Sequence, residues 1–312
     1  MQHKGKVIKS AGKNSIVVAE TGESIYCIIG GKYRLEDLKS TNPVVVGDHV
    51  LFEMISPAGK GRITEVLERK NYIIRRSSKL SKTYQIIASN IDQLMLLVTI
   101  RQPVTFPEFI DRYLVTAEAY NIPSIIIFNK TDLLDEVDLQ KMNDLSSVYS
   151  TIGYPCIPIS ALCKTNIESV REIMKDKINL LAGISGVGKS TLINQLDESY
   201  SLKTTRISDY HASGKHTTTF VEMFFLHFGA YVIDTPGIKG FGITDMENEP
   251  ISHYFPEIFK ISTSCRYKNC RHVNEPFCAV IEAVSTRNIS LSRYRSYLSL
   301  LEEQAGYSKY RR

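Results

Sequence analysis

The sequence lacks the features of a membrane-spanning, exported or disulfide-stabilised protein. No apolar run approaches the ~18 residues that a membrane helix needs, and Leu94–Ile100, among the longest, is far too short. Met1–Lys6 leads into no apolar signal segment, so we expect a cytoplasmic protein without a membrane partner. Six cysteines in 312 residues are too few for a disulfide scaffold.

The sequence also lacks a strong excess of basic or acidic residues, since the net charge is only +5. Apolar residues make up 43% and charged residues 23%, which is ordinary globular usage and excludes a disordered chain. The length, about twice the ~150 residues of one domain, predicts two or three domains.

The first 70 residues predict a small closed β-barrel, either OB-like or SH3-like, because short Val/Ile/Tyr-rich stretches alternate with glycines. The expected strands are Gly5–Lys9, Ser15–Ala19, Ser24–Ile29, Val44–Phe52 and Arg62–Leu67. Residues 71–90 carry four basic residues and no acid. We interpret them as a basic linker, either solvated or acting as a strap that contacts phosphate.

From residue 91 to about 255, strands alternate with helices, which predicts a mostly parallel α/β sheet covered on both faces. The expected strands are Gln93–Ile100, Pro123–Phe128, Pro155–Ile159, Ile178–Ala182 and the pair Phe220–Phe228 and Ala230–Ile233. Residues 256–312 predict a third, mainly helical domain, with helix from roughly Phe277 onward.

A glycine-rich loop between an apolar strand and a helix matches the Walker A pattern for binding nucleoside triphosphates. Its residues are Gly183, Ile184, Ser185, Gly186, Val187, Gly188, Lys189, Ser190 and Thr191. The glycines let backbone N–H groups surround phosphate oxygens, and the following helix presents its positive end to them. Lys189 reaches the outer phosphates as a catalytic group, and the Ser190 hydroxyl ligates Mg²⁺.

The sequence Asn129-Lys130-Thr131-Asp132 follows a strand and predicts guanine recognition. The carboxylate of Asp132 accepts from guanine N1–H and the exocyclic amine, a pattern that adenine cannot supply. Asn129 braces the loop, and the stem of Lys130 covers the ring. Ser160 and Ala161 follow the next strand and place a backbone N–H near guanine O6.

Asp234-Thr235-Pro236-Gly237 matches the D-x-x-G switch, with Asp234 on Mg²⁺ and the Gly237 N–H sensing the γ-phosphate. In the preceding segment, Gly214–Thr219, we favour Thr218 for Mg²⁺, with Thr217 and Thr219 as close rivals. No glutamine follows the D-x-x-G segment at 238–240, so His216 is the local candidate for positioning water, with a loop histidine without catalytic duty as the alternative.

Together these segments make up the full set of GTPase motifs, but their order is rotated. The base-reading loop, Asn129–Asp132, precedes the phosphate loop, Gly183–Thr191. This is a circular permutation, which proteins tolerate when the old termini lie close together. The switch segment consequently runs into the C-terminal domain. Nucleotide-dependent ordering of the switch can therefore move the C-terminal domain.

A cluster of three cysteines and one histidine near the C-terminus has the composition of a structural zinc site with no open position. The predicted ligands are Cys265, Cys270, His272 and Cys278. The neighbouring Arg266, Lys268 and Arg271 favour the thiolate form.

The rotated order, the barrel in front and the cysteine cluster behind resemble the RsgA family of circularly permuted GTPases over essentially the whole chain. The resemblance implies an OB-fold, a permuted GTPase domain and a zinc domain. It implies a cytoplasmic monomer that acts in late maturation of the small ribosomal subunit, contacts its rRNA and has its GTP hydrolysis stimulated by the subunit. His216 maps onto the family's candidate for water activation.

The charge distribution agrees with this division. Residues 1–70, 71–90 and 256–312 carry +3, +4 and +5, whereas residues 91–255 carry −7. Basic flanks suit RNA phosphate, and the acidic centre suits a switch. The alternatives are an ATP-dependent P-loop enzyme, against which Asn129–Asp132 argues, and an RNA-binding scaffold with vestigial nucleotide binding.

Overall fold

The computed structural model describes residues 2–30, 43–56, 59–76, 84–200, 222–234 and 250–309. It divides into two compact units that interleave along the chain, and each is described by itself. The first comprises residues 1–95, 164–182 and 189–240, and the second comprises residues 96–163, 183–188 and 241–312.

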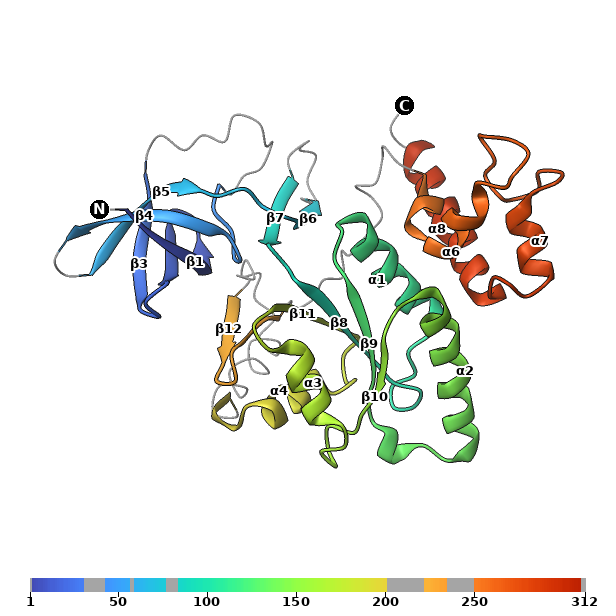
Figure 1. The fold of residues 1–312 in the computed structure, drawn as a ribbon, viewed down its shortest axis with the longest axis horizontal. Helices are drawn as coiled ribbons and strands as arrows, with labels where there is room; N and C mark the ends of the chain where they lie inside the picture. The colour runs from blue at the N-terminus through green and yellow to red at the C-terminus, as the bar shows by residue number, and fades with distance from the viewer. Residues whose placement is uncertain are drawn as a thin grey trace. The chain divides into compact units, whose positions relative to one another are not determined.

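The N-terminal strands of the first unit form a closed five-stranded barrel (Figure 1). They are β1 (Gln2–Ala11), β2 (Asn14–Ala19), β3 (Ser24–Ile29), β4 (His49–Ser56) and β5 (Lys60–Val66). Neighbouring strands pair in the order β1-β2-β3-β5-β4, with β3 and β5 parallel, and β4 returns to β1. This closure is that of an OB-fold rather than an SH3-like barrel, and alternate apolar residues such as Val7, Val17 and Phe52 fill its interior.

The fourth predicted strand, Val44–Phe52, is partly wrong, because residues 44–48 are a bend and a turn with an isolated bridge from Val46 to Ala88, and the strand begins at His49. The cause is Asp48, a fully buried carboxylate that accepts the backbone N–H of Val45. The guanidinium of Arg69 donates to both carboxylate oxygens at 2.6 and 2.8 Å, and the Ser89 hydroxyl donates at 2.6 Å. Such charge-assisted bonds satisfy a buried charge and fix the turn.

Residues 71–90, predicted as a basic linker, contain two paired antiparallel strands, β6 (Tyr72–Arg76) and β7 (Tyr84–Ser89). Buried amides close the base of this hairpin. The side chain of Asn71 donates to the Ile91 carbonyl and accepts the Ile91 N–H, and Asn90 donates to the Gly47 carbonyl. The central residues 77–83 lie outside the described residues.

The remainder of the first unit is α/β in character, as the strand–helix alternation predicts. Its elements are the start of β8 (Gln93–Val98), α3 (Ile167–Met174), β11 (Ile178–Ala182), α4 (Lys189–Leu196), η2 (Glu198–Tyr200), β12 (Glu222–Leu226) and β13 (Ala230–Asp234). Strands β11 and β13 are parallel, and β12 and β13 form the expected antiparallel pair. β12 also pairs with β1 at Lys9↔Glu222, so the sheet continues into the barrel.

The second unit combines residues 96–163 of the α/β domain, which include the predicted base-reading segment and are called the base-reading half below, with the C-terminal helices. Its elements are the end of β8, α1 (Pro107–Ala119), β9 (Ser124–Phe128), η1 (Thr131–Leu133), α2 (Glu136–Ile152), β10 (Cys156–Pro158), η4 (Ile251–Tyr254), α6 (Pro256–Ser262), α7 (Ala279–Ser285) and α8 (Leu291–Lys309). β9 and β10 are parallel, and every residue of β9 is buried. Val115 of α1 lies in one apolar core with Ile251, Phe255 and Tyr297, so the C-terminal helices pack on α1 as part of the same unit.

The helical region expected from roughly Phe277 begins at Ala279 and is divided into two helices, α7 and α8. α7 begins after Cys278, and its end is marked by Arg287, whose φ is +63°. The predicted domain boundaries at residues 70, 90 and 255 stay a prediction.

Gly47 provides a test of the junction between the barrel and the hairpin. Its φ is +92°, and a Cβ atom there would lie 2.0 Å from the carbonyl oxygen of Ser89. Gly22 has a similar φ of +87° with open space around it. We expect Gly22→Ala to lower the free energy of unfolding by about 1–2 kcal/mol through backbone strain alone. Gly47→Ala should lose clearly more in urea unfolding, because the Ser89 backbone must move. Equal losses would contradict the close approach.

Candidate functional site: a guanine-nucleotide loop cluster and a cysteine-rich centre

Asn129 joins the three loops that the sequence assigns to nucleotide binding. It follows β9 directly, is buried, and its backbone N–H donates to the Val98 carbonyl. Its side-chain amide donates to the Val187 carbonyl of the glycine-rich loop at 2.7 Å. The amide oxygen accepts the Ala161 N–H at 3.0 Å. One buried side chain therefore braces the base-reading loop against the phosphate loop and the Ser-Ala loop.

The glycine at position 188 is required by this contact. Its φ is +97°, and a Cβ atom would lie 2.4 Å from Nδ2 of Asn129. Any side chain there would displace the amide that links the loops. The loop is anchored from within by Val187, which is fully buried.

Asp132 is exposed, and one of its carboxylate oxygens accepts the Ser160 hydroxyl at 2.5 Å. The Ser160 oxygen in turn accepts the Cys163 N–H at 3.0 Å. The two segments predicted to read the base are therefore in direct contact, and Ser160 contributes through its side chain as well as through the loop backbone.

The start of the helix predicted to bind phosphate agrees with the sequence pattern. α4 begins at Lys189, directly after the glycine loop, and Ser190 and Thr191 lie in its first turn. In the same unit β13 ends at Asp234, whose backbone is in register with Leu181 of β11. The side chain of Asp234 and the predicted residues His216, Thr217, Thr218, Thr219 and Gly237 lie outside the described residues.

The β8–α1 loop contacts the base-reading loop in a way that the sequence did not reveal. Arg101 donates to the Leu133 carbonyl at 3.3 Å and forms ion pairs with Asp135 and Asp138 at the start of α2. The Lys130 ammonium donates to the Gln102 carbonyl. No local pattern marks Arg101 or Gln102, because their partners lie about thirty residues further along the chain.

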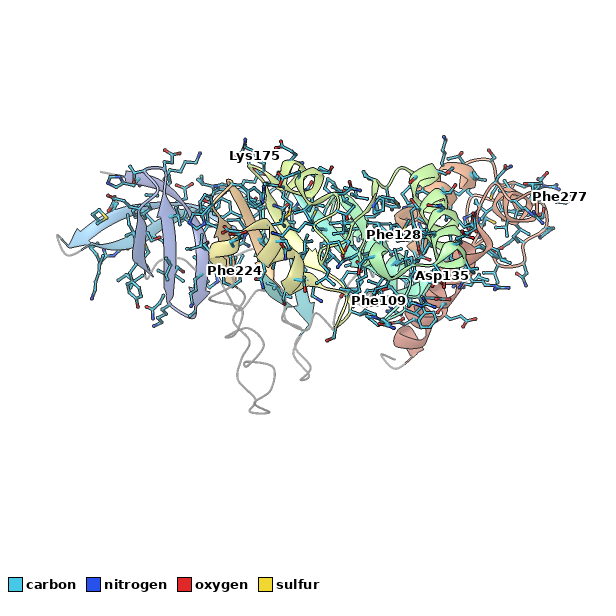
Figure 2. All side chains as sticks on the ribbon, turned by 90° about the horizontal axis from the view of Figure 1, so that it is seen from below. Phe109, Phe128, Asp135, Lys175, Phe224 and Phe277 are labelled. Atoms are coloured by element: carbon cyan, nitrogen blue, oxygen red, sulfur yellow. The ribbon has the colours of Figure 1, made fainter. Side chains whose placement is uncertain are left out.

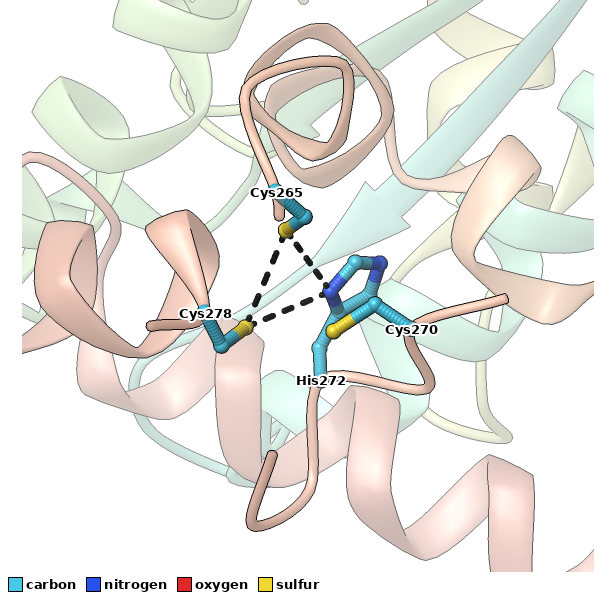
Figure 3. A group of neighbouring side chains, drawn as sticks. All are labelled: Cys265, Cys270, His272 and Cys278. Carbon is cyan, nitrogen blue, oxygen red and sulfur yellow. Dashed lines mark hydrogen bonds between the residues drawn. The ribbon is translucent and has the colours of Figure 1, made fainter. Parts of the chain in front are cut away.

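The cysteine-rich centre has the dimensions of a tetrahedral metal site (Figure 3). The donor atoms of Cys265, Cys270, His272 and Cys278 all lie within 4.8 Å of one another. The Sγ atoms of Cys265 and Cys278 are 3.9 Å apart. They lie 3.6 Å and 3.4 Å, respectively, from Nδ1 of His272. Around Zn²⁺, ideal edges are about 3.8 Å between sulfurs and about 3.5 Å from sulfur to nitrogen, given bonds of ~2.3 and ~2.0 Å. The three measured edges are consistent with zinc, and the sulfur of Cys270 lies within 4.8 Å of the other donors as a possible fourth ligand.

That Arg266, Lys268 and Arg271 favour the thiolate form stays a prediction. Burial is the main cause that raises the pKa of the Cys270 thiol to about 12, and it also raises the pKa of Cys278. Burial lowers the pKa of His272, which favours the neutral imidazole that ligates metals. A metal cation bound at the site would oppose the shift at Cys270 and Cys278 and favour their thiolates.

Three side chains support the backbone of this loop from outside the ligand set. The hydroxyls of Tyr294 and Tyr297 on α8 donate to the carbonyls of His272 and Arg271, both at 2.6 Å. The Glu275 carboxylate accepts the N–H groups of three nearby residues, and these bonds hold its pKa near 2 although its partial burial acts in the opposite direction.

The same helix is fixed to the base-reading half by a buried ion pair. Arg293 of α8 is fully buried and donates to Asp111 of α1 at 2.7 Å. It donates to both carboxylate oxygens of Glu257, at 2.7 and 3.1 Å, and Tyr149 of α2 donates to Asp111. Burial raises the pKa of Asp111, and the Arg293 guanidinium opposes that shift. Removing one partner would leave a buried charge uncompensated.

The fold and the loop cluster define a class of protein. A glycine-rich loop between β11 and α4, an N-K-x-D segment after β9 and an Asp at the end of β13 are the parts of a P-loop GTPase. Because the base-reading segment comes first in the chain, the class is that of circularly permuted GTPases.

Comparisons with known proteins specify the family. Residues 66–244 match the family described as RsgA GTPase. The chain is 52% identical to the "Small ribosomal subunit biogenesis GTPase RsgA" of Phocaeicola vulgatus, over 96% of this chain and 97% of the relative. It is 50% identical to the protein of that name from Flavobacterium johnsoniae, over 96% and 92%. The chain belongs to the RsgA GTPase family, as its sequence resemblance indicates, and is a GTP-hydrolysing enzyme by that membership.

Solved structures support the assignment along the whole chain. The crystal structure of YjeQ from Thermotoga maritima superimposes with a TM-score of 0.80 at 36% identity, covering 98% of this chain and 99% of that one. That of YloQ, a circularly permuted GTPase, superimposes with 0.77 at 28% identity, covering 98% and 96%. In the described part of this chain, no helix has the length and apolar character needed to cross a membrane.

The cysteine-rich centre can be tested by metal analysis. We expect the purified protein to contain one zinc ion per chain by elemental analysis, and Cys270→Ser to lower that content because one of four ligands is lost. Cys163→Ser, at an exposed cysteine outside the cluster, serves as the control and should leave the zinc content unchanged. Metal-free wild-type protein would rule out the zinc assignment.

Proposed function

We propose that this protein hydrolyses GTP as an assembly factor of the small ribosomal subunit. The observation that carries the proposal is the buried Asn129 amide, which joins the base-reading, Ser-Ala and phosphate loops into one cluster. The names of the relatives, which are small-subunit biogenesis GTPases, supply the ribosomal context.

In this proposal the loops divide recognition of the nucleotide between them. Asp132 accepts from the guanine N1–H and amine, and the Lys130 stem covers the ring. Thr131, Ser160 and Ala161 complete the base-reading surface. Residues 183–188 enclose the phosphates with backbone N–H groups. Lys189 contacts the outer phosphates from the first turn of α4.

Magnesium and water complete the proposed hydrolytic site. Ser190, Thr218 and Asp234 would hold Mg²⁺, which neutralises phosphate charge, and the N–H of Gly237 would sense the γ-phosphate. His216 is the proposed residue that positions the attacking water, because no glutamine follows Asp234–Gly237 in the sequence.

The flanking segments are the proposed RNA-binding parts. The barrel and hairpin, residues 1–90, and the C-terminal residues 256–312 carry the basic excess, whereas residues 91–255 are acidic. An OB-fold supplies a surface suited to nucleic acid, and the cysteine-rich centre would be held by zinc. We further propose a cytoplasmic monomer that binds the rRNA of the small subunit through these parts.

Substitution of Asp132 tests the base assignment. Asp132→Asn should weaken GTP binding by roughly a hundredfold, because two charge-assisted hydrogen bonds of ~1.5–3 kcal/mol each are disturbed. Xanthosine triphosphate should bind better than GTP, since its C2 oxygen accepts from the new amide. Competition binding with GTP, XTP and ATP is the measurement, and Asp144→Asn on the exposed face of α2 is the isosteric control. Unchanged GTP affinity, or displacement of GTP by ATP in the wild type, would favour an ATP-dependent enzyme.

Hydrolysis with and without the ribosomal partner tests the function. Unassisted turnover can be as slow as about 10⁻⁴ s⁻¹ in GTPases. We expect purified small ribosomal subunits to accelerate phosphate release at least tenfold, and the protein to co-sediment with them in a non-hydrolysable GTP analogue. Co-sedimentation without GTP hydrolysis would indicate an RNA-binding scaffold. If the subunits neither stimulate GTP hydrolysis nor co-sediment with the protein, the ribosomal role is refuted.

A further inference from the structure

The loop around the cysteine-rich centre exposes an aromatic surface that the fold does not use. Phe277 is 74% exposed and Tyr267 is 42% exposed. Figure 2 shows Phe277 projecting at the outer edge of the C-terminal helices. A ring with so much exposed area contributes little to the core.

The backbone at Phe277 makes the choice of residue more unusual. Its φ is +59°, in the left-handed region that bulky residues rarely adopt and that glycine adopts without strain. The adjacent ligand Cys278 is buried, so the turn is needed to bring the thiol inward. Glycine would serve that turn better. The aromatic ring therefore occupies a position whose backbone favours glycine, and most of its area is exposed.

The charges around the ring are positive. The Arg266 guanidinium carbon lies 5.1 Å from the centre of the Phe277 ring and 5.8 Å from that of Tyr267, so one cation lies against both aromatic faces. Lys268 and Arg271 are exposed in the same loop. Glu275, the single acid in residues 265–278, is engaged by three backbone N–H groups of the loop itself.

We propose that Phe277, Arg266 and Tyr267 form a stacking surface for an unpaired base of RNA, with Lys268 and Arg271 contacting the adjoining phosphates. Exposed aromatic rings combined with arginine bind bases of single-stranded RNA through their flat faces, and neighbouring cations bind the backbone. The positive charge is complementary to RNA. The proposal rests on the function proposed above and specifies where in the C-terminal part a base is bound.

The absence of tryptophan from the chain allows a direct test of stacking. Phe277→Trp places a single indole at the surface. A twelve-nucleotide single-stranded oligoadenylate should quench its fluorescence in a saturable manner, and added salt should weaken the binding. A duplex RNA of equal length should not quench it. Phe259→Trp, at a 46%-exposed phenylalanine on α6, is the matched control and should not respond.

Phe277→Gly separates binding from folding. It removes the ring but suits the left-handed backbone, so the zinc content and the melting temperature should not fall. Its affinity for the oligonucleotide, measured by anisotropy, and for small subunits should fall about fivefold or more. Arg266→Ala should weaken binding in the same direction.

The outcomes distinguish this proposal from the ribosomal function. If the wild type binds small subunits but Phe277→Gly binds them and the oligonucleotide equally well, the stacking surface is refuted and the function stands. If the wild type does not bind subunits, the proposed function fails, whatever the fluorescence shows. If Phe277→Gly loses subunit binding while the indole is not quenched by RNA, the surface contacts a protein and the RNA proposal is wrong.

Discussion

The buried amide of Asn129 is the constraint on which the nucleotide-binding half depends. It connects loops that follow β9, β10 and β11, and its two hydrogen bonds cross 58 and 32 residues of sequence. An amide has one donor and one acceptor side, so a single asparagine can fix both loops, whereas an aspartate would lack the donor. Circular permutation leaves this arrangement intact, because the contact depends on which strand ends adjoin and not on their order in the chain. The contact also requires Gly188, since only glycine leaves room there for the amide of Asn129.

A second buried interaction, the ion pair between Arg293 and Asp111, attaches the C-terminal helices to α1. Arg293 reaches Asp111 across 182 residues, and Val115 shares a core with the C-terminal residues. The C-terminal helices therefore form one unit with α1, the helix next to the loop that contacts Lys130 and Leu133. The chain after β13 leads into η4 of the same unit.

The parts of the fold that were predictable from sequence are those encoded locally. The glycine loop and α4 follow from nine consecutive residues, and the metal cluster from four residues within fourteen. The hairpin at residues 71–90 was not predictable from its basic composition, because its base is closed by Asn71 bonding to Ile91 and by Asn90 bonding to Gly47, 43 residues earlier. Arg101 and Arg293 were missed for the same reason, since their partners are distant in sequence. The turn at residues 44–48 was overlooked because an apolar run, Val44–Val46, conceals the role of Asp48.

The net charges counted from the sequence include buried residues, which cannot contact RNA and have to be considered separately. Arg69 and Arg293 are buried in ion pairs and cannot reach phosphate. Their partners Asp48 and Glu257 come from the same flanking segments, so each pair removes one charge of each sign and the excess of +3 and +5 is unchanged. Asp111, the other partner of Arg293, belongs to the acidic centre, where its burial removes part of the apparent negative charge. The basic excess of the flanks therefore comes from residues outside these pairs, which is the condition for a salt-dependent interaction with RNA.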